Sequence, residues 1–324
     1  MGRPRRWAGI EISPEAVRVL QFTRSGPAVE VAREVNARIA CGSGPGGEGQ
    51  WRTAARALKD AARAAGTWKV PAVVSLSGLP VVIRELNMPV LPPRLLERAV
   101  FHQLPAISPL PVEEMLFDYL VEPDPGTPGR QVVTVIGLRR STADAVCMTL
   151  AHNRWARYHL EVAPLSLGRL LGGRLQQAPG QVILVHADFA WLQVTGFLIG
   201  RPQWVKTLIR ATGRAERKEP GSETREELVS HARWTVRGVL ELLRNGDSAL
   251  GPRAMTIQSV VVVSPQAMSD ALVEELGQVL PFPVEAGSQW LAELGLSPDA
   301  LVARPDIGAA AVALGAGLRL GWRW

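Results

Sequence analysis

A run of glycines near the N-terminus is the first part of the sequence whose residue types suit a chemical task. The segment Gly42–Gly47 (GSGPGG) matches the spacing G-x-G-x-x-G, in which backbone N–H groups bind the pyrophosphate of a dinucleotide. Such a site also needs a carboxylate at the end of the next strand, to bind the ribose. Here Pro45 has no N–H to donate, and the next predicted strand, residues 70–76, is followed by Ser77 instead of a carboxylate. We therefore interpret this segment as a flexible connector.

Other residues suited to catalysis are few and scattered. The sequence has no G-x-x-x-x-G-K-[ST] loop, no G-x-S-x-G elbow and no H-E-x-x-H helix, which mark common phosphate, serine-nucleophile and zinc sites. The two cysteines, Cys41 and Cys147, form neither a disulfide framework nor a four-thiolate metal site. No histidine pairs with another ligand at metal-binding spacing; the five are His102, His152, His159, His186 and His231. The motifs alone thus indicate no catalytic and no metal site.

Composition is typical of a soluble globular protein. The chain has 324 residues, of which 47% are hydrophobic and 20% charged, enough for one large domain or two smaller ones. Its net charge of +6 is the only feature that favours a nucleic-acid partner. We discount it, because Arg alternates with Glu in residues 214–227 and the ten tryptophans are spread over separate elements. The apolar stretch Ile307–Leu318 is too short to span a bilayer, so we expect a soluble cytosolic protein.

The expected secondary structure falls into two similar halves. Each half opens with three strands in succession, predicted within residues 7–39 and 181–209 from alternating apolar residues and from Gly and Pro turns. Helices are expected at residues 51–65, 94–104, 141–152, 163–176, 223–244, 266–280 and 307–320. Further strands are expected at 70–76, 80–86, 115–122, 131–138, 256–263 and near 283–285, with an irregular Pro-rich segment at 105–112. This repetition of topology predicts a two-lobed α/β protein.

Three stretches of the sequence match a known pattern. They are GIEIS at residues 9–13, the segment 73–122, and DIGAAAVALGAGLRLG at residues 306–321. The middle segment follows the pattern R-x-I-x-L-P-x-M, prolines, a helix, I-P and D-Y, at Arg84, Leu86, Met88, Pro89, Ala106–Pro109, Asp118 and Tyr119. In this order the stretches resemble the PilM family, the actin-like cytoplasmic proteins of type IV pilus assembly, which are related to the cell-division protein FtsA.

The resemblance covers nearly the whole chain and implies a two-lobed actin-like (ribonuclease H-like) fold. The first lobe would comprise residues 1–178, with an inserted subdomain at about 73–122. The second lobe would comprise residues 179–305, and a C-terminal helix at 306–324 would return to the first lobe.

The resemblance also implies a nucleotide cleft between the lobes, formed by two phosphate hairpins and an adenosine turn. The first hairpin reads D-I-G-S-S-S-V-K in the family and E-I-S-P-E-A-V-R at residues 11–18 here. The second reads D-I-G-A in the family and V-H-A-D at residues 185–188 here. The cleft residues implied by this alignment are Glu11, Ser13 and Asp188.

Most positions that a nucleotide needs are replaced. Pro14 removes an N–H donor, Glu15 adds a negative charge beside the phosphates, and the glycine pair of the adenosine turn is replaced by residues 264–267 (SPQA). We therefore expect no ATPase activity and favour no cofactor. ATP with magnesium is the alternative, in which Glu11 and Asp188 would coordinate the metal.

By resemblance, the expected function is that of a scaffold without catalysis at the cytoplasmic face of a bacterial inner membrane. It would bind the N-terminal cytoplasmic segment of a PilN-like membrane protein, and membrane association would come through that partner. The candidate docking residues are Arg84, Leu86, Phe101, Leu104, Ile107 and Leu110. The last four are a dense apolar set in a Pro-interrupted segment. The related cytoplasmic GspL domain of type II secretion implies that an actin-like scaffold can serve without nucleotide.

The sequence leaves open the oligomeric state, the apparatus that the protein serves and a nucleotide-dependent function. The chain could form homo-oligomers, as its actin-type relatives do. The apparatus it serves could be a pilus, a secretion system or a DNA-uptake system. The alternative function is an ATP-dependent switch in the same machinery, in which nucleotide closes the lobes and changes the affinity for the partner.

Overall fold

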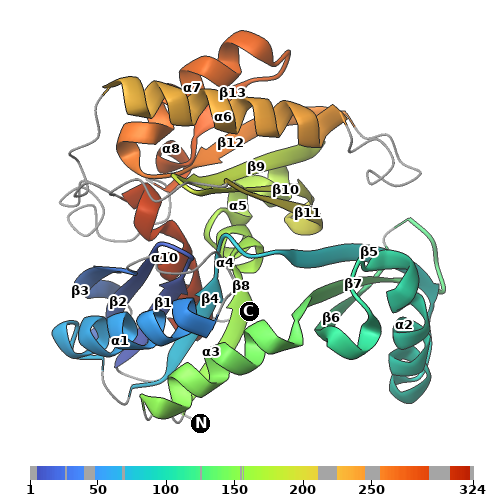
Figure 1. Cartoon of the computed structure of the whole chain (residues 1–324). Helices are drawn as coiled ribbons and strands as arrows, with labels where there is room; N and C mark the ends of the chain where they lie inside the picture. Colours follow the sequence, from blue (N-terminus) through green and yellow to red (C-terminus); the bar gives the residue numbers. More distant parts are fainter. Residues whose placement is uncertain are drawn as a thin grey trace.

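The computed structural model describes residues 6–25, 28–39, 48–67, 70–124, 126–153, 155, 157–210, 225–244, 256–291 and 307–321. The chain forms two α/β lobes, one above the other, and an arm that extends to one side (Figure 1). The glycine segment 42–47 lies outside the described residues.

The first lobe is built on a five-stranded sheet in the order β3-β2-β1-β4-β8. Its strands are β1 (Arg6–Ile12), β2 (Ala16–Ser25), β3 (Ala28–Arg38), β4 (Ala72–Leu76) and β8 (Tyr158–Val162). The first three strands are antiparallel, and β4 and β8 run parallel to β1. Alternation along β1 places Ala8 and Ile10 in the core with α1 (Glu48–Ala64) and α3 (Arg140–His152), while Trp7 packs on the opposite face with α4 (Ala163–Leu170) and α10 (Ile307–Gly321).

The second lobe repeats this topology. Its strands are β9 (Gln181–Asp188), β10 (Trp191–Leu198), β11 (Arg201–Ile209), β12 (Ile257–Val263) and β13 (Val284–Ala286), in the order β11-β10-β9-β12-β13. Again the first three strands are antiparallel and the last two parallel to the first. Helices α6 (Arg225–Arg244) and α7 (Gln266–Val279) bury one face of this sheet. The repeated order confirms the predicted two-lobed α/β fold.

The arm is an insertion between β4 and α3. It contains β5 (Val81–Pro89), α2 (Pro93–Ile107), a 3₁₀ turn (Val112–Glu114), β6 (Met115–Pro123) and β7 (Arg130–Arg139). Its strands lie in the order β5-β7-β6, and β5 joins the second-lobe sheet through the pairing of Arg84 with Trp204 on β11. The insertion thus spans 81–139 instead of about 73–122. Residues 72–76 pair with β1 in the first lobe, and β7 pairs with both β5 and β6.

Other differences from the predicted elements have local causes. Helix α2 continues through Pro105 to Ile107, because a proline near a helix end removes only one backbone bond, and Ser108 N–H closes the last turn on Leu104 O at 3.0 Å. The predicted helix 163–176 is two helices, α4 and α5 (Gly172–Gln177), with Leu171 between them. The short strand β8 and the one-turn helix α8 (Gly287–Leu291) were not predicted. The remaining predicted elements are present within a few residues, apart from residues 223 and 224 of the helix before β12, which lie outside the described part.

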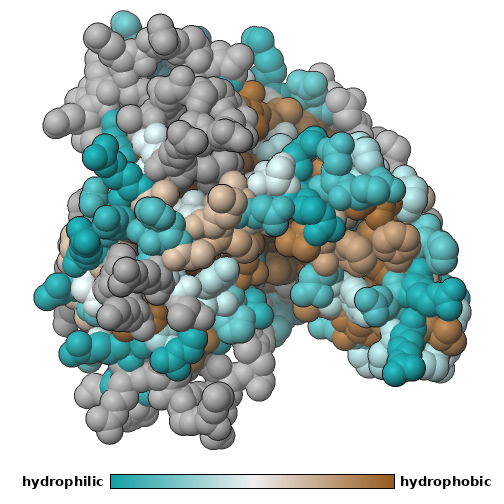
Figure 2. Space-filling model, turned by 60° about the horizontal axis from the view of Figure 1, so that its bottom comes forward, coloured by the Kyte–Doolittle hydropathy of each residue, from teal (hydrophilic) through white to brown (hydrophobic). Residues whose placement is uncertain are grey.

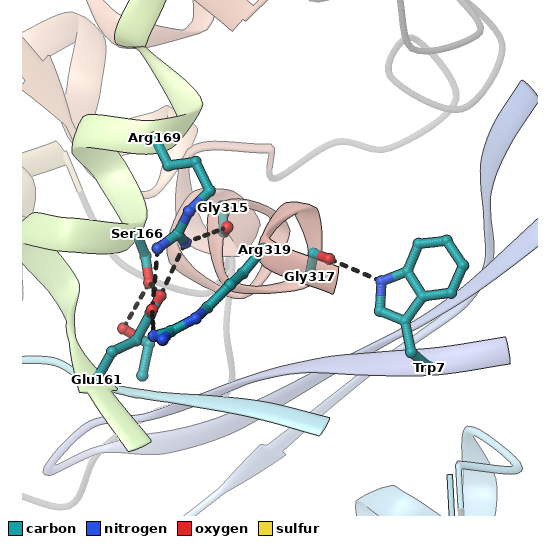
Figure 3. Close-up of polar contacts among 8 residues, drawn as sticks. Trp7, Glu161, Ser166, Arg169, Gly315, Gly317 and Arg319 are labelled. Atoms are coloured by element: carbon teal, nitrogen blue, oxygen red, sulfur yellow. Dashed lines mark hydrogen bonds and ion pairs between the residues drawn. The ribbon is translucent and has the colours of Figure 1, made fainter. Parts of the chain in front are cut away.

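Helix α10 is fixed to the first lobe by a buried polar cluster (Figure 3). Glu161, at 5% exposure, accepts two hydrogen bonds from Arg169 on α4, at 2.9 and 3.0 Å, and one from Arg319 on α10 at 3.0 Å. Arg169 also donates to Gly315 O at 2.8 Å, and Trp7 Nε1 donates to Gly317 O at 2.7 Å. The hydroxyl of Ser166 is hydrogen-bonded to Glu161 and to Ser75. One carboxylate therefore joins β8, α4 and α10.

None of the helices in the described residues is both long enough and apolar enough to span a bilayer.

Candidate functional site

Strands β1, β2 and β9 bring one arginine between two carboxyl groups. The antiparallel register places Arg18 on β2 opposite Glu11 on β1, and Asp188 is the last residue of β9. Arg18 donates from Nη1 to Glu11 Oε2 at 3.1 Å and from Nη2 to Asp188 Oδ2 at 3.1 Å. All three side chains are buried, with exposures of 8%, 0% and 7% for Arg18, Glu11 and Asp188. Because β9 belongs to the second lobe, Arg18 joins the two lobes.

The charges within this group follow from burial and contact. Burial raises the pKa of Glu11, an effect that Arg18 opposes. Burial alone would also raise the pKa of Asp188, but the Arg18 guanidinium and the Phe189 N–H hold that pKa below its usual value. Burial alone would lower the pKa of Arg18, yet the two carboxylates raise it above its usual value. Arg18 therefore stays charged and lies against one carboxyl group from each lobe.

The turn of the first hairpin, residues 13–16, has no backbone N–H left to donate to a phosphate. Ser13 N–H donates to Ala16 O at 2.9 Å, and Pro14 has no N–H. The N–H groups of Glu15 and Ala16 both donate to the Ser13 hydroxyl oxygen, at 3.3 and 3.1 Å. The Ser13 side chain is thus used in closing the β1–β2 turn.

His186 takes the carboxylate position of the second hairpin. Its ring packs edge-to-face on Trp191, with ring centroids 4.6 Å apart, and it is 5% exposed. Burial, together with the charge of Arg18, lowers the pKa of His186 to about 3. The side chain is therefore a neutral imidazole and brings no negative charge to a metal.

Magnesium and ATP do not fit the hairpins as they stand. The two carboxylates that would coordinate a metal already share the Arg18 guanidinium, and the hairpin donors are used within the turn. Among the described residues, no group of three or more His, Cys, Asp or Glu side chains has the arrangement of a metal site.

The neutral state of His186 gives the stability of the protein a specific pH dependence. The pKa of His186 in the folded state, about 3, lies below its unfolded value near 6.5, so the unfolded chain binds the proton first as pH falls. Stability should then be lost from about pH 6.5 downward, by about 2 kcal/mol between pH 7 and pH 5. Urea unfolding at both pH values measures this loss.

Two variants separate His186 from the other titrating groups. His186→Phe should lose much less stability over this pH interval, whereas His159→Gln, at an exposed histidine, should behave as the unchanged protein does. Equal losses in the unchanged protein and in His186→Phe would contradict a buried neutral imidazole.

The proposed docking residues lie at several depths in the insertion. Leu104 is 0% exposed and packs in the insertion core, where Leu86 and Ile107 also contribute partly buried side chains. Leu104 therefore lies beneath the surface. Phe101 is 50% exposed on α2, and Leu110 follows the helix at intermediate exposure.

Arg84 has a different environment. It lies where β5 meets β11, it is partly buried, and its guanidinium donates to Ile83 O at 2.8 Å. Burial lowers the pKa of Arg84.

Strand β6 adds exposed apolar residues that the sequence did not single out. Met115 faces the core with α2, whereas Leu116 and Leu120 are 38% and 51% exposed, and Val121 is also exposed. β6 forms the end of the eight-stranded sheet. Its alternating sequence predicts a strand with two unlike faces, but an edge position depends on strand order, which alternation does not encode.

A pocket of about 760 Å³ lies elsewhere, between the end of β11 and α6. Its lining residues are Arg210, Glu226, Val229, Ser230, Arg233, Trp234 and Arg237. It includes no residue of either hairpin.

Comparison with known proteins gives structural relatives only. No family model and no curated protein sequence matches the chain. A solved structure described as the PilM–PilN type IV pilus biogenesis complex superposes with a TM-score of 0.75 at 19% identity, over 99% of this chain and 100% of that one. The cytoplasmic domain of EpsL, an inner-membrane component of the type II secretion system of Vibrio cholerae, superposes with a TM-score of 0.52 at 13% identity, over 98% and 96% of the two chains. The resemblance found in the sequence is therefore confirmed in three dimensions, and the chain has the fold found in the PilM–PilN complex.

Proposed function

We propose that this protein is a scaffold in the assembly of a type IV pilus, or of a related secretion or DNA-uptake apparatus. In this role it binds the N-terminal cytoplasmic segment of a PilN-like membrane protein at the cytoplasmic face of the inner membrane. Similarity over the whole chain to the PilM–PilN complex, and to the EpsL cytoplasmic domain, supports the assignment to this kind of machinery.

The observation that carries a docking function is the uneven distribution of exposed apolar side chains. Of nine large hydrophobic residues that are exposed in the described chain, six lie in the insertion: Val90, Leu95, Phe101, Leu116, Leu120 and Val121. Figure 2 shows hydrophobic side chains on the arm and around the hollow where the arm meets the rest of the molecule. Phe101 lies on the outer side of α2, whereas Leu116 and Leu120 lie on the sheet face that points away from α2, so the insertion carries two exposed apolar surfaces. Exposed apolar surfaces mark sites of association.

The exposed apolar residues of the insertion favour, as a binding partner, an extended or helical segment with apolar side chains. Phe101 offers a large, half-exposed ring on α2, and aromatic residues of this kind dominate the energy of protein interfaces. Leu116 and Leu120 lie on an edge strand with Asp118 between them, so the surface combines apolar contacts with charge. We assign the docking function to the insertion as a whole.

The scaffold acts without catalysis and without a bound nucleotide. Support comes from the first hairpin, whose donors are used internally, and from the Arg18 guanidinium between Glu11 and Asp188. The second candidate, an ATP-dependent switch, is favoured by one feature. Glu11 and Asp188 still bring a carboxyl group from each lobe to the same place, on the two sides of Arg18.

The docking surface is tested by titrating the full chain with a peptide. The peptide is the cytoplasmic N-terminal segment of a PilN-like membrane protein. Phe101→Ser should weaken binding by roughly tenfold or more, the effect of losing an interface hot spot. Val279→Ser on α7, whose side chain is 48% exposed, is the matched control and should leave the affinity unchanged. Equal affinities for the two variants would exclude α2 from the docking surface.

A further inference from the structure

We propose that Arg18 is a built-in cation that holds the two lobes together, in the place where the sequence resemblance implies a metal and a nucleotide. The protein then needs no ligand to reach the closed arrangement of its lobes. Neither the fold comparison nor the proposed docking function assigns this role to Arg18.

The Arg18 guanidinium lies between carboxyl groups of the two lobes. Nη1 binds Glu11 of the first lobe and Nη2 binds Asp188 of the second, each at 3.1 Å. Arg18 on β2 pairs with Glu11 on β1, whereas Asp188 is 170 residues away from Arg18 along the chain. A guanidinium with two forked donors can satisfy two carboxylates at once, which suits it to join elements from different lobes.

The group is also buried. The side chains of Arg18 and Asp188 are 8% and 7% exposed, so water and salt screen their attraction only weakly. Moving the lobes apart would separate Arg18 from Asp188. The contact therefore favours the closed lobes over the open ones, in contrast to an exposed ion pair such as Arg139–Glu114, whose members are 50% and 49% exposed.

The second lobe also positions the insertion. β5 pairs with β11 through Arg84 and Trp204, and Gln203 Nε2 donates to Glu85 Oε1 at 2.7 Å. Arg201 on β11 forms an ion pair with Glu122 on β6 at 3.1 Å. A rotation of the second lobe would therefore carry the insertion with it, so the Arg18 contact also fixes the insertion relative to the first lobe. Only this last consequence, constant presentation of the docking surface, rests on the proposed function.

The test measures the distance between the lobes in the full chain without any partner. Spin labels are attached at Arg56→Cys on α1 and Glu274→Cys on α7, both exposed positions, after replacement of Cys41 and Cys147. Electron double resonance should give one narrow distance distribution that millimolar Mg-ATP leaves unchanged. Asp188→Asn, which removes the second-lobe charge without changing shape, should lose this narrow distribution. Glu114→Gln, at the exposed pair, is the matched control and should retain it.

A second variant tests the cation itself. Arg18→Ala should also lose the narrow distribution, and added guanidinium ions should restore it by filling the space between Glu11 and Asp188. Circular dichroism establishes that each variant is folded, and if Arg18→Ala is not, Asp188→Asn decides alone. The proposal would be overturned if the distance distribution in Asp188→Asn were as narrow as in the unchanged protein. It would also be overturned if Mg-ATP shifted the distance distribution of the unchanged protein. Because no partner is present, failure here is distinct from failure of the docking function.

Discussion

Gly9→Ala is expected to lower the free energy of unfolding by about 4 kcal/mol or more, among the largest effects that a single methyl group can have. Gly9 lies on β1 against α10. A Cβ atom there would lie 2.0 Å from Ala313 O and 2.7 Å from Gly317 N, both backbone atoms of α10. Backbone cannot rotate away as a side chain can, so the methyl group must displace the whole helix. Denaturant unfolding measures the change.

A glycine in open surroundings provides the control for this effect. At Gly277 on α7, a Cβ atom would meet nothing within 4 Å. Gly277→Ala should therefore stabilise the protein slightly, by about 0.5 to 1 kcal/mol, because alanine favours the helix. If both variants changed stability by similar amounts, close contact between β1 and α10 would not explain the result.

Glu161→Gln is expected to destabilise the protein by about 3 to 5 kcal/mol, the usual effect of removing one partner from a buried ion group. The amide keeps the shape of the side chain, but it leaves Arg169 and Arg319 without a negative charge. Arg169 is 9% exposed, so its guanidinium cannot turn to water. Because Arg319 lies on α10, the loss should appear first as detachment of that helix, which amide hydrogen exchange detects residue by residue.

The exposed pair again provides the comparison. Glu114→Gln removes a carboxylate from Arg139 at a half-exposed site and should change stability by about 0.5 kcal/mol or less. A loss at Glu161 no larger than this would mean that the cluster of Figure 3 does not hold α10 in place.

The periodicity of apolar residues predicted most of the fold. Each lobe packs its sheet against helices, so strands and helices carry apolar residues at regular spacings. Alternation in residues 7–39 gave the three antiparallel strands of the first lobe, and the matching pattern in 181–209 gave those of the second. Strand β8 was missed because five residues (YHLEV) with a central leucine carry little alternation. The extent of the insertion was misjudged for a different reason. β4 and β5 are separated by four residues, and only strand pairing shows that they belong to different sheets.

The candidate site was predicted in part. The substitutions at Ser13, Pro14 and His186 are visible in the sequence, and they led to the expectation that a nucleotide would find few donors. Arg18 was not recognised, since an arginine at the last position of the hairpin motif looks like a conservative exchange. Its partner Asp188 lies 170 residues away, and no local pattern relates the two. Contacts between lobes depend on how the complete chain folds back on itself.

The same limitation applies to the docking residues. Leu104 and Phe101 look alike in the sequence, as apolar residues three positions apart on a helix. The structure gives them 0% and 50% exposure, because α2 turns one face to β5–β7 and the other to solvent. The buried residues Leu96, Val100 and Leu104 recur every four positions, as one face of a helix does. The docking set was instead chosen by apolar residue type in a segment expected to be irregular from Pro105 onward, so helical spacing was not applied to it.

The central claim is that this scaffold binds its partner without a nucleotide. It is tested most directly by calorimetric titration of the full chain with the partner's cytoplasmic peptide, in the absence and in the presence of millimolar Mg-ATP. We predict saturable binding of the peptide with the same Kd in both conditions, and no heat from Mg-ATP alone. Saturable binding of Mg-ATP that changes the Kd of the peptide, and that is lost in Asp188→Ala, would contradict the account and identify the protein as an ATP-dependent switch.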